Sequence, residues 1–88
     1  MPGLAQVTDR ATIFDAPAGR VVEAYAEGAV GRDAVRAFYA RTLPQLGWRA
    51  DGADRYAREG ETLRLEFPEA WPDSAPNRLL VRFFLSPG

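Results

Sequence analysis

Cysteine, histidine and lysine are all absent from this chain of 88 residues. Without cysteine there is no disulfide, no thiol nucleophile and no cysteine-ligated zinc site. Without histidine the chain lacks the commonest general base and the commonest transition-metal ligand. A Ser-His-acid triad and a Ser-Lys pair are therefore excluded, although Ser74 and Ser86 are present. These absences remove most familiar catalytic constellations and favour a protein that is not an enzyme.

The chain also lacks an excess of charge and a long apolar run. Its net charge is −1, with eleven arginines interleaved among twelve acidic residues. Such a balance gives no general attraction to nucleic acid or to an anionic membrane. The opening residues, MPGLAQVTD, have neither the basic region nor the apolar region of an export signal. As written, the chain is expected in the cytoplasm, with the envelope or periplasm as the alternative if a leader has been removed.

The overall composition is that of a small folded domain. Hydrophobic residues make up 47% of the chain and charged residues 26%, which is typical of globular proteins. A chain of this length has room for one domain, which we place over residues 1–88, with residues 1–7 as a flexible tail. The use of Arg without Lys, together with frequent Ala, indicates a GC-rich coding sequence rather than a set of anion clamps.

The stretch DAVRAFYARTLPQLGW has the periodicity of a helix that packs on a core. Asp33 places a negative charge in the first turn and Arg41 a positive charge near the other end, both favourable to the helix dipole. Pro44 opposes continuation of the helix, and Gly47 suits the left-handed residue that follows a helix. We therefore expect a helix over residues 32–43 and then a tight turn. Its apolar stripe comprises Val35, Phe38, Tyr39, Thr42, Leu43 and Leu46.

Segments on both sides of this helix have the alternation of β-strands. The order β-β-α-β-β-β predicts an α+β fold, a two-layer sandwich of one helix on one face of an antiparallel sheet of about five strands. Ala24 and Ala26 are small enough to lie directly beneath the helix. The expected strands are residues 11–14, 20–27, 48–59 with a turn or bulge at 51–54, 62–67 and 77–86. The expected core is Val22, Ala24, Ala26, Val35, Phe38, Tyr39, Thr42, Leu46, Leu63, Leu65, Phe67, Val81, Phe83 and Leu85.

The sheet face opposite the helix, called the outer face below, is the first candidate for a partner-binding site. By alternation Tyr25, Leu80 and Phe84 project from it, among Glu23, Arg64, Glu66 and Arg82. Such a patch can bind a protein partner or form a weak homodimer. The alternative is a set of scattered apolar residues covered by the stems of the arginines. Trp71, in the proline-rich loop at 68–77, is the fourth candidate, and its alternative is a lid on the edge of the core.

A small-ligand site is the second functional alternative. A pocket between the helix and the loop at 68–77 would be lined by Tyr39, Trp48 and Trp71. The acids Asp51 and Asp54 match no calcium-loop pattern and are interpreted as polar turn residues. The sequence predicts no metal, cofactor or catalytic residue.

The motif FYARTLPQLGW at 38–48 is distinctive. Together with DAPAGRVVEA at 15–24 and REGETLRLEF at 58–67, it resembles a small family of uncharacterised bacterial domains in which a helix with an FY pair runs into LPxxGW and then into strands. The resemblance covers most of the chain. It implies structural roles for the motif, no catalytic residues, and, in many members, an export or lipoprotein leader. The leading hypothesis is therefore an accessory or interaction domain that acts through protein contacts.

Overall fold

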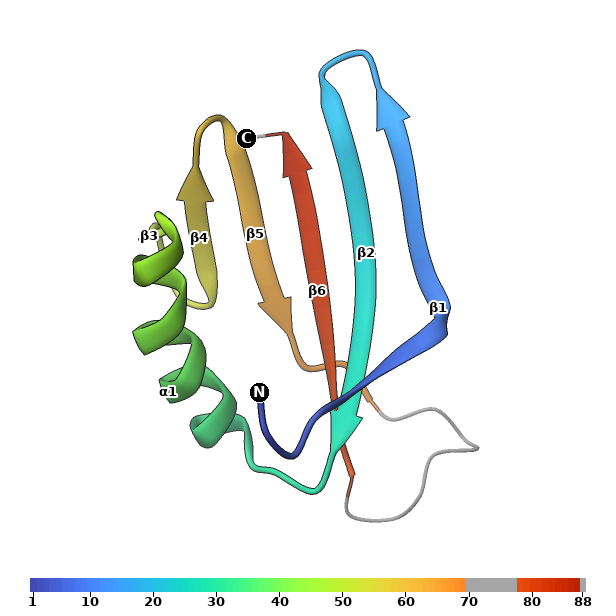
Figure 1. Ribbon diagram of the computed structural model, residues 1–88, viewed down its shortest axis with the longest axis vertical. Coiled ribbons are helices and arrows are strands. Elements are labelled where there is room, and N and C mark those ends of the chain that lie inside the picture. The colour runs from blue at the N-terminus through green and yellow to red at the C-terminus, as the bar shows by residue number, and fades with distance from the viewer. Residues whose placement is uncertain (70–77, 88) are drawn as a thin grey trace.

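The computed structural model describes residues 1–69 and 78–87, apart from the side chains of residues 8–10 and 16 (Figure 1). Over these residues a single helix and six strands form two layers, which confirms the expected α+β class. The helix is α1 (Arg32–Thr42), followed by the 3-10 turn η1 (Leu43–Leu46). The strands are β1 (Ala5–Ala16), β2 (Gly19–Gly28), β3 (Arg49–Ala50), β4 (Arg55–Arg58), β5 (Glu61–Glu66) and β6 (Leu79–Pro87).

The described strands form one antiparallel sheet in the order β1-β2-β6-β5-β4-β3. Consecutive strands joined by short turns are neighbours, as between β4 and β5, where Gly60 has a φ of 82° and Glu59 a φ of 49°. Two successive positive φ values suit the right-handed twist of a tight hairpin. The last strand, β6, lies in the middle of the sheet between β2 and β5. The sheet has one strand more than expected because β3 pairs separately from β4.

The helix begins and ends where local chemistry predicts. Gly31 is its N-cap in an extended conformation, and an acid and a base occupy the first and last turns as expected. Pro44 tightens the chain into the 3-10 turn η1, after which Gly47 adopts a φ of 91°. The amide of Trp48 then donates to the carbonyl of Leu43 at 3.1 Å, so the chain turns back toward the sheet. The predicted helix end is confirmed, although the regular helix stops a residue earlier, at Thr42.

The core lies between α1, η1 and the β4–β5–β6 region of the sheet. Leu46, expected in it, is 59% exposed, whereas Leu43 is buried. The physical reason is the 3-10 turn, whose three residues per turn rotate Leu46 away from the stripe that a continuous α-helix would have kept. The buried cluster consists of Val35, Leu43, Trp48, Tyr56, Leu65 and Val81, with Tyr39, Leu63, Phe67, Phe83 and Leu85 among the half-buried residues around it.

The first seven residues are not a flexible tail, and that expectation was wrong. Residues 5–7 pair with residues 25–27 of β2, and Met1 and Leu4 pack against the core. Toward the N-terminus, β1 therefore continues past a register shift between Val7 and Thr12, and the residues before β1 cross the sheet (Figure 1). The driving force is burial of the two apolar side chains.

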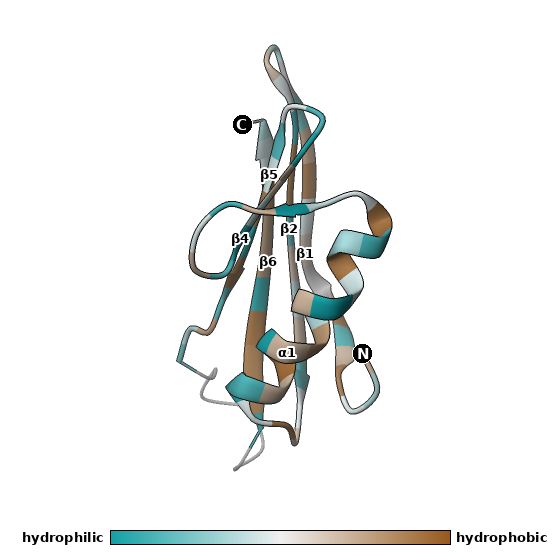
Figure 2. Ribbon diagram, turned by 90° about the vertical axis from the view of Figure 1, so that its left-hand side faces the viewer, coloured by the Kyte–Doolittle hydropathy of each residue, from teal (hydrophilic) through white to brown (hydrophobic). Residues whose placement is uncertain are grey.

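The helix covers only one side of the sheet. In Figure 1 it lies toward the β3–β4–β5 side, and Figure 2 shows it on a single face. The N-terminal segment, not the helix, lies against the end of β2, where a Cβ at Gly28 would be 1.7 Å from the carbonyl oxygen of Gly3. Strand β2, which carries Ala24 and Ala26, therefore lies beside the helix rather than beneath it (Figure 1). As a result, the helix leaves some of the helix-side face of the sheet uncovered.

Candidate interaction surface

A row of apolar side chains crosses the helix-side face of the sheet. The strand registers place Ile13 opposite Val22, Val22 opposite Leu85, and Leu85 opposite Leu63. Leu63 is in turn opposite the buried Tyr56. Side chains that are directly opposite on an antiparallel pair lie on the same face and in contact distance. The row therefore runs from the core to the β1 edge without a polar interruption.

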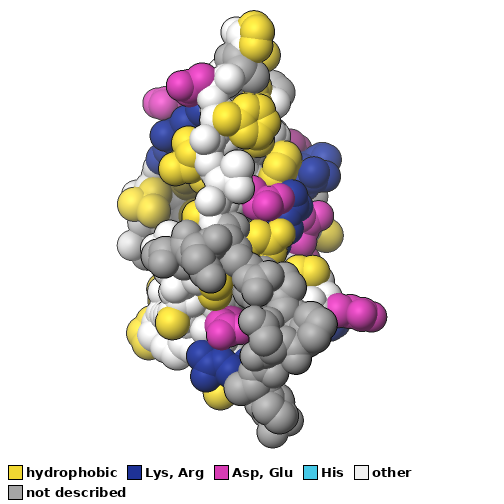
Figure 3. Space-filling view, turned by 90° about the vertical axis from the view of Figure 1, so that its right-hand side faces the viewer, with side chains coloured by type: hydrophobic (Ala, Val, Ile, Leu, Met, Phe, Trp, Pro, Cys, Tyr) yellow, Lys and Arg dark blue, Asp and Glu magenta, His cyan; other side chains and the backbone are white. Residues whose placement is uncertain are grey.

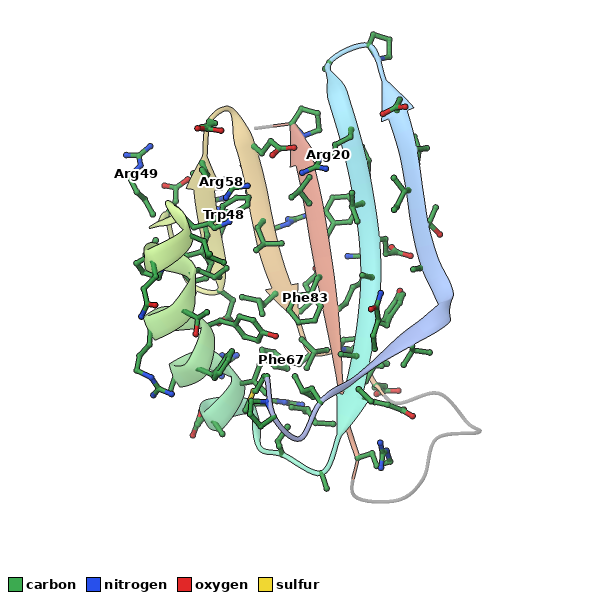
Figure 4. The ribbon with its side chains drawn as sticks, viewed as in Figure 1. Arg20, Trp48, Arg49, Arg58, Phe67 and Phe83 are labelled. Atoms are coloured by element: carbon green, nitrogen blue, oxygen red, sulfur yellow. The ribbon has the colours of Figure 1, made fainter. Side chains whose placement is uncertain are left out.

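The exposure of this row rises toward the β1 edge. Leu63, Leu85 and Val22 are half-buried, and Ile13 is 72% exposed. In Figure 1 neither the helix nor the N-terminal segment lies over the upper parts of β6, β2 and β1, and in Figure 4 Phe83 marks the middle of the sheet next to this region. An apolar surface at water is costly, so a row of this kind is a candidate interaction site.

A second exposed apolar residue projects from the same edge on the other face. Phe14 is 54% exposed and lies opposite Val21 of β2. Figure 3, which faces this edge, shows hydrophobic side chains along its upper part. The stretch 11–14 contains no charge and no proline, although natural edge strands usually carry such residues against unwanted pairing. The edge is therefore open to an added strand over this stretch.

An ion pair lies at the upper end of the uncovered region. Arg20 of β2 donates from Nε to a carboxylate oxygen of Glu61 of β5 at 3.2 Å. The pair spans the end of the intervening strand β6, and Figure 4 shows Arg20 there. Because both side chains remain partly exposed, the pair contributes little to stability, but it gives the apolar row a polar border.

On the outer face, by contrast, arginine side chains form ion pairs and pack against an aromatic ring. Arg82 donates from Nε to Glu23 at 2.9 Å and from Nη1 to Glu66, so that β2, β6 and β5 are bridged. Burial alone would lower the pKa of Arg82, but these hydrogen bonds raise it, which keeps the guanidinium charged. The Arg82 guanidinium also lies 4.6 Å from the ring centroid of Phe84, and that of Arg64 lies 5.5 Å from it. The arginine stems and heads thus cover much of this face.

The four sequence-predicted partner residues do not form one exposed patch. Tyr25 and Phe84 lie on the outer face as expected, since Tyr25 is opposite Arg82. Leu80 is only 2% exposed, so its interpretation as a surface residue was wrong. It lies opposite Glu27 and belongs to β6, a strand with neighbours on both sides, where less of a side chain is open to water than at an edge. Trp71 lies outside the described residues.

Two of the three residues expected to line the alternative ligand pocket, Trp48 and Tyr39, are packed against other side chains. Trp48 is buried, and the Arg58 guanidinium lies 4.4 Å from the centroid of its ring while Nη1 donates to the carbonyl of Leu46 at 2.9 Å (Figure 4). Tyr39 meets Phe83 edge-on with 5.4 Å between the ring centroids, and burial raises its pKa. The third wall, at Trp71, lies outside the described residues.

The acidic turn after β3 is held by arginines. Arg36 of α1 donates from Nε to Asp54 at 3.0 Å, and Arg55 lies 3.8 Å from a carboxylate oxygen of Asp51. The hydrogen bond to Asp54 raises the pKa of Arg36. Within residues 1–69 and 78–87, no three acidic side chains come together as a metal site. Over the same ranges, no helix combines the length and apolarity needed to span a membrane.

The sequence did not predict the exposed apolar edge at β1, because no local pattern marks this strand as an edge strand. The alternation in ATIF predicts a strand, but not that the strand lies at the edge of the sheet or that the helix stops short of it. Comparison of the chain with protein-family models, with curated proteins and with solved structures gave no significant match.

Proposed function

We propose that this domain acts by binding a protein through the β1 surface, defined as Ile13, Phe14, Val22 and Leu85. The observation that carries the proposal is the apolar row that ends at an isoleucine with 72% exposure. Single exposed apolar residues are ordinary on protein surfaces. A row that continues across three strands is different, because its members can be covered together by one partner.

The magnitude of the available burial supports a binding role. Full burial of an Ile or Phe side chain is worth about 1.5–3 kcal/mol. Ile13 is 72% exposed and Phe14 54% exposed, so covering both would contribute roughly 2–4 kcal/mol. Residues that contribute more than about 1 kcal/mol dominate most interfaces. Because the two side chains project from opposite faces of β1, only a partner that reaches both sides of this edge gains the full amount.

The residue types present in the chain agree with a role that involves no catalysis. The chain has no histidine, cysteine or lysine. Several carboxylates that could act as acid or base, among them Glu23, Asp54 and Glu66, hydrogen-bond to arginine side chains. In these residues the carboxylate oxygens that would contact a substrate are engaged by guanidinium groups.

Site-specific photocrosslinking in cells that produce the protein tests the proposal. A benzoylphenylalanine at position 13 is expected to give a discrete crosslinked protein species. The same group at position 46 is the control, because Leu46 is also exposed, at 59%, but lies on η1 away from β1. No crosslink from position 13, or equal crosslinking from both positions, would refute a binding role for the β1 surface.

A further inference from the structure

The two exposed residues of β1 indicate how a partner approaches. Ile13 projects from the helix-side face and Phe14 from the outer face, because neighbouring residues of a strand alternate. A partner that packs on one face covers only one of them. A strand added alongside β1 approaches both and also satisfies the outward backbone groups of an edge strand. The geometry therefore favours strand addition over packing against a face.

We propose that the added strand is β1 of a second copy of this chain, paired antiparallel over residues 11–15 about a two-fold axis near Ile13. This inference rests on the proposed binding role of the β1 surface and names its partner. A two-fold axis perpendicular to the sheet keeps each face on its own side, so opposed residues must project from the same face. Centred on Ile13, the pairing sets Ile13 against itself and Phe14 against Thr12 of the second copy.

This register is favoured over its neighbour by the side chains that it opposes. A pairing shifted by two residues, with Phe14 opposite itself, would set Ile13 against the carboxylate of Asp15. Centred on Ile13, Asp15 lies opposite Ala11 instead, so no like charges are opposed within residues 11–15. The chain's net charge of −1 adds only weak repulsion between copies.

The row of apolar side chains explains why a copy fits better than an unrelated strand. Each copy brings the same row to its own edge, from Leu63 through Leu85 and Val22 to Ile13. Pairing at Ile13 joins the two rows into one that crosses both sheets. The opposite edge does not offer this, because β3 has only two residues, both exposed, and begins with an arginine.

The absence of cysteine allows a direct test on the full chain. In Ile13→Cys the two thiols would be opposed, with Cα atoms about 5 Å apart, within the range for a disulfide. In the control Ala11→Cys the thiols would be offset by four positions, about 13 Å along the strand, which is too far. We expect oxidation to give a disulfide-linked dimer from Ile13→Cys and none from Ala11→Cys.

Sedimentation equilibrium of unmodified protein and of charge variants completes the test. Wild type is expected to self-associate. Phe14→Lys and Ile13→Lys should each weaken association about tenfold or more, while Leu46→Lys should change it less than about twofold. The substituted side chains are exposed, so circular dichroism should be unchanged.

A chain that stays monomeric up to about 1 mM would overturn the second-copy inference. Association that responds to Ile13→Lys and not to Phe14→Lys would also overturn it, in favour of packing on one face. Crosslinks from position 13 to a different protein would overturn the second-copy inference and leave the proposed binding role standing. A crosslink at the mass of two chains would support both.

Discussion

The close approach of the N-terminal segment to Gly28 gives a sharp prediction about stability. A Cβ at this position would lie 1.7 Å from the carbonyl oxygen of Gly3 and 3.2 Å from the Cα of Leu4. Both are backbone atoms, so the substitution Gly28→Ala cannot be accommodated by a side-chain rotation. Gly28 is not among the glycines with positive φ, so the backbone itself accepts alanine. The variant must therefore displace the N-terminal segment.

The expected cost follows from what that segment buries. Met1 and Leu4 are half-buried against the core. Losing half of a full burial of about 1.5–3 kcal/mol for each would cost roughly 1.5–3 kcal/mol in total. Replacing glycine by alanine returns about 0.4–1 kcal/mol by restricting the unfolded chain. The net loss should be about 1–2 kcal/mol, which corresponds to a lowering of Tm by roughly 5–15 °C for a domain of this size.

Urea unfolding followed by tryptophan fluorescence measures this loss, with Gly31→Ala as the matched control. A Cβ at Gly31 meets nothing within 4 Å, so its free energy of unfolding should change by less than about 0.5 kcal/mol. A double-mutant cycle adds the mechanism: Leu4→Ala should cost stability in the wild type and almost nothing in Gly28→Ala. If Gly28→Ala were as stable as wild type, the N-terminal segment would not lie where it is described.

Two further outcomes concern single side chains. Because burial raises the pKa of Tyr39, the folded state holds the phenol proton more tightly than the unfolded state, and stability should fall as pH rises above about 10. The urea midpoint of Tyr39→Phe should lack this part of the fall. If the variant and the wild type had the same pH profile, the burial of the phenol would be contradicted. Replacing Arg82 by Leu leaves Glu23 and Glu66 without their shared guanidinium, so the free energy of unfolding should fall by about 1–2 kcal/mol. This loss should shrink as salt is raised from about 0.1 to 1 M, because salt screens the interaction. A loss that does not depend on salt would refute an electrostatic origin.

Features set by a few neighbouring residues could be predicted from the sequence. The end of the helix follows from Pro44 and Gly47, since proline removes a backbone donor and glycine accepts a positive φ at low cost. The hairpin at Gly60 follows in the same way. The faces of the strands were also predicted correctly where they depend on alternation alone, as for Tyr25 and Phe84. In each case the deciding interaction is local.

Features set by the arrangement of whole elements could not be predicted. No local pattern says that β6, the last strand, lies between β2 and β5. The burial of Leu80 depends on that central position, and the docking of Leu4 depends on where Gly28 lies. The uncovered state of Ile13 depends on the position of the helix. Long-range pairing therefore decides the surface on which the proposed function rests.

A comparison of widths explains why this surface exists. Six strands spaced about 4.8 Å apart make a sheet roughly 24 Å across, whereas a helix with its side chains is about 10 Å wide. One helix can therefore cover two or three strands, and the N-terminal segment covers only the end of β2. If the remaining face were adapted to water, its outermost position would be polar. It is instead Ile13, at the end of an unbroken apolar row that begins at the core, and the proposed binding role rests on this position.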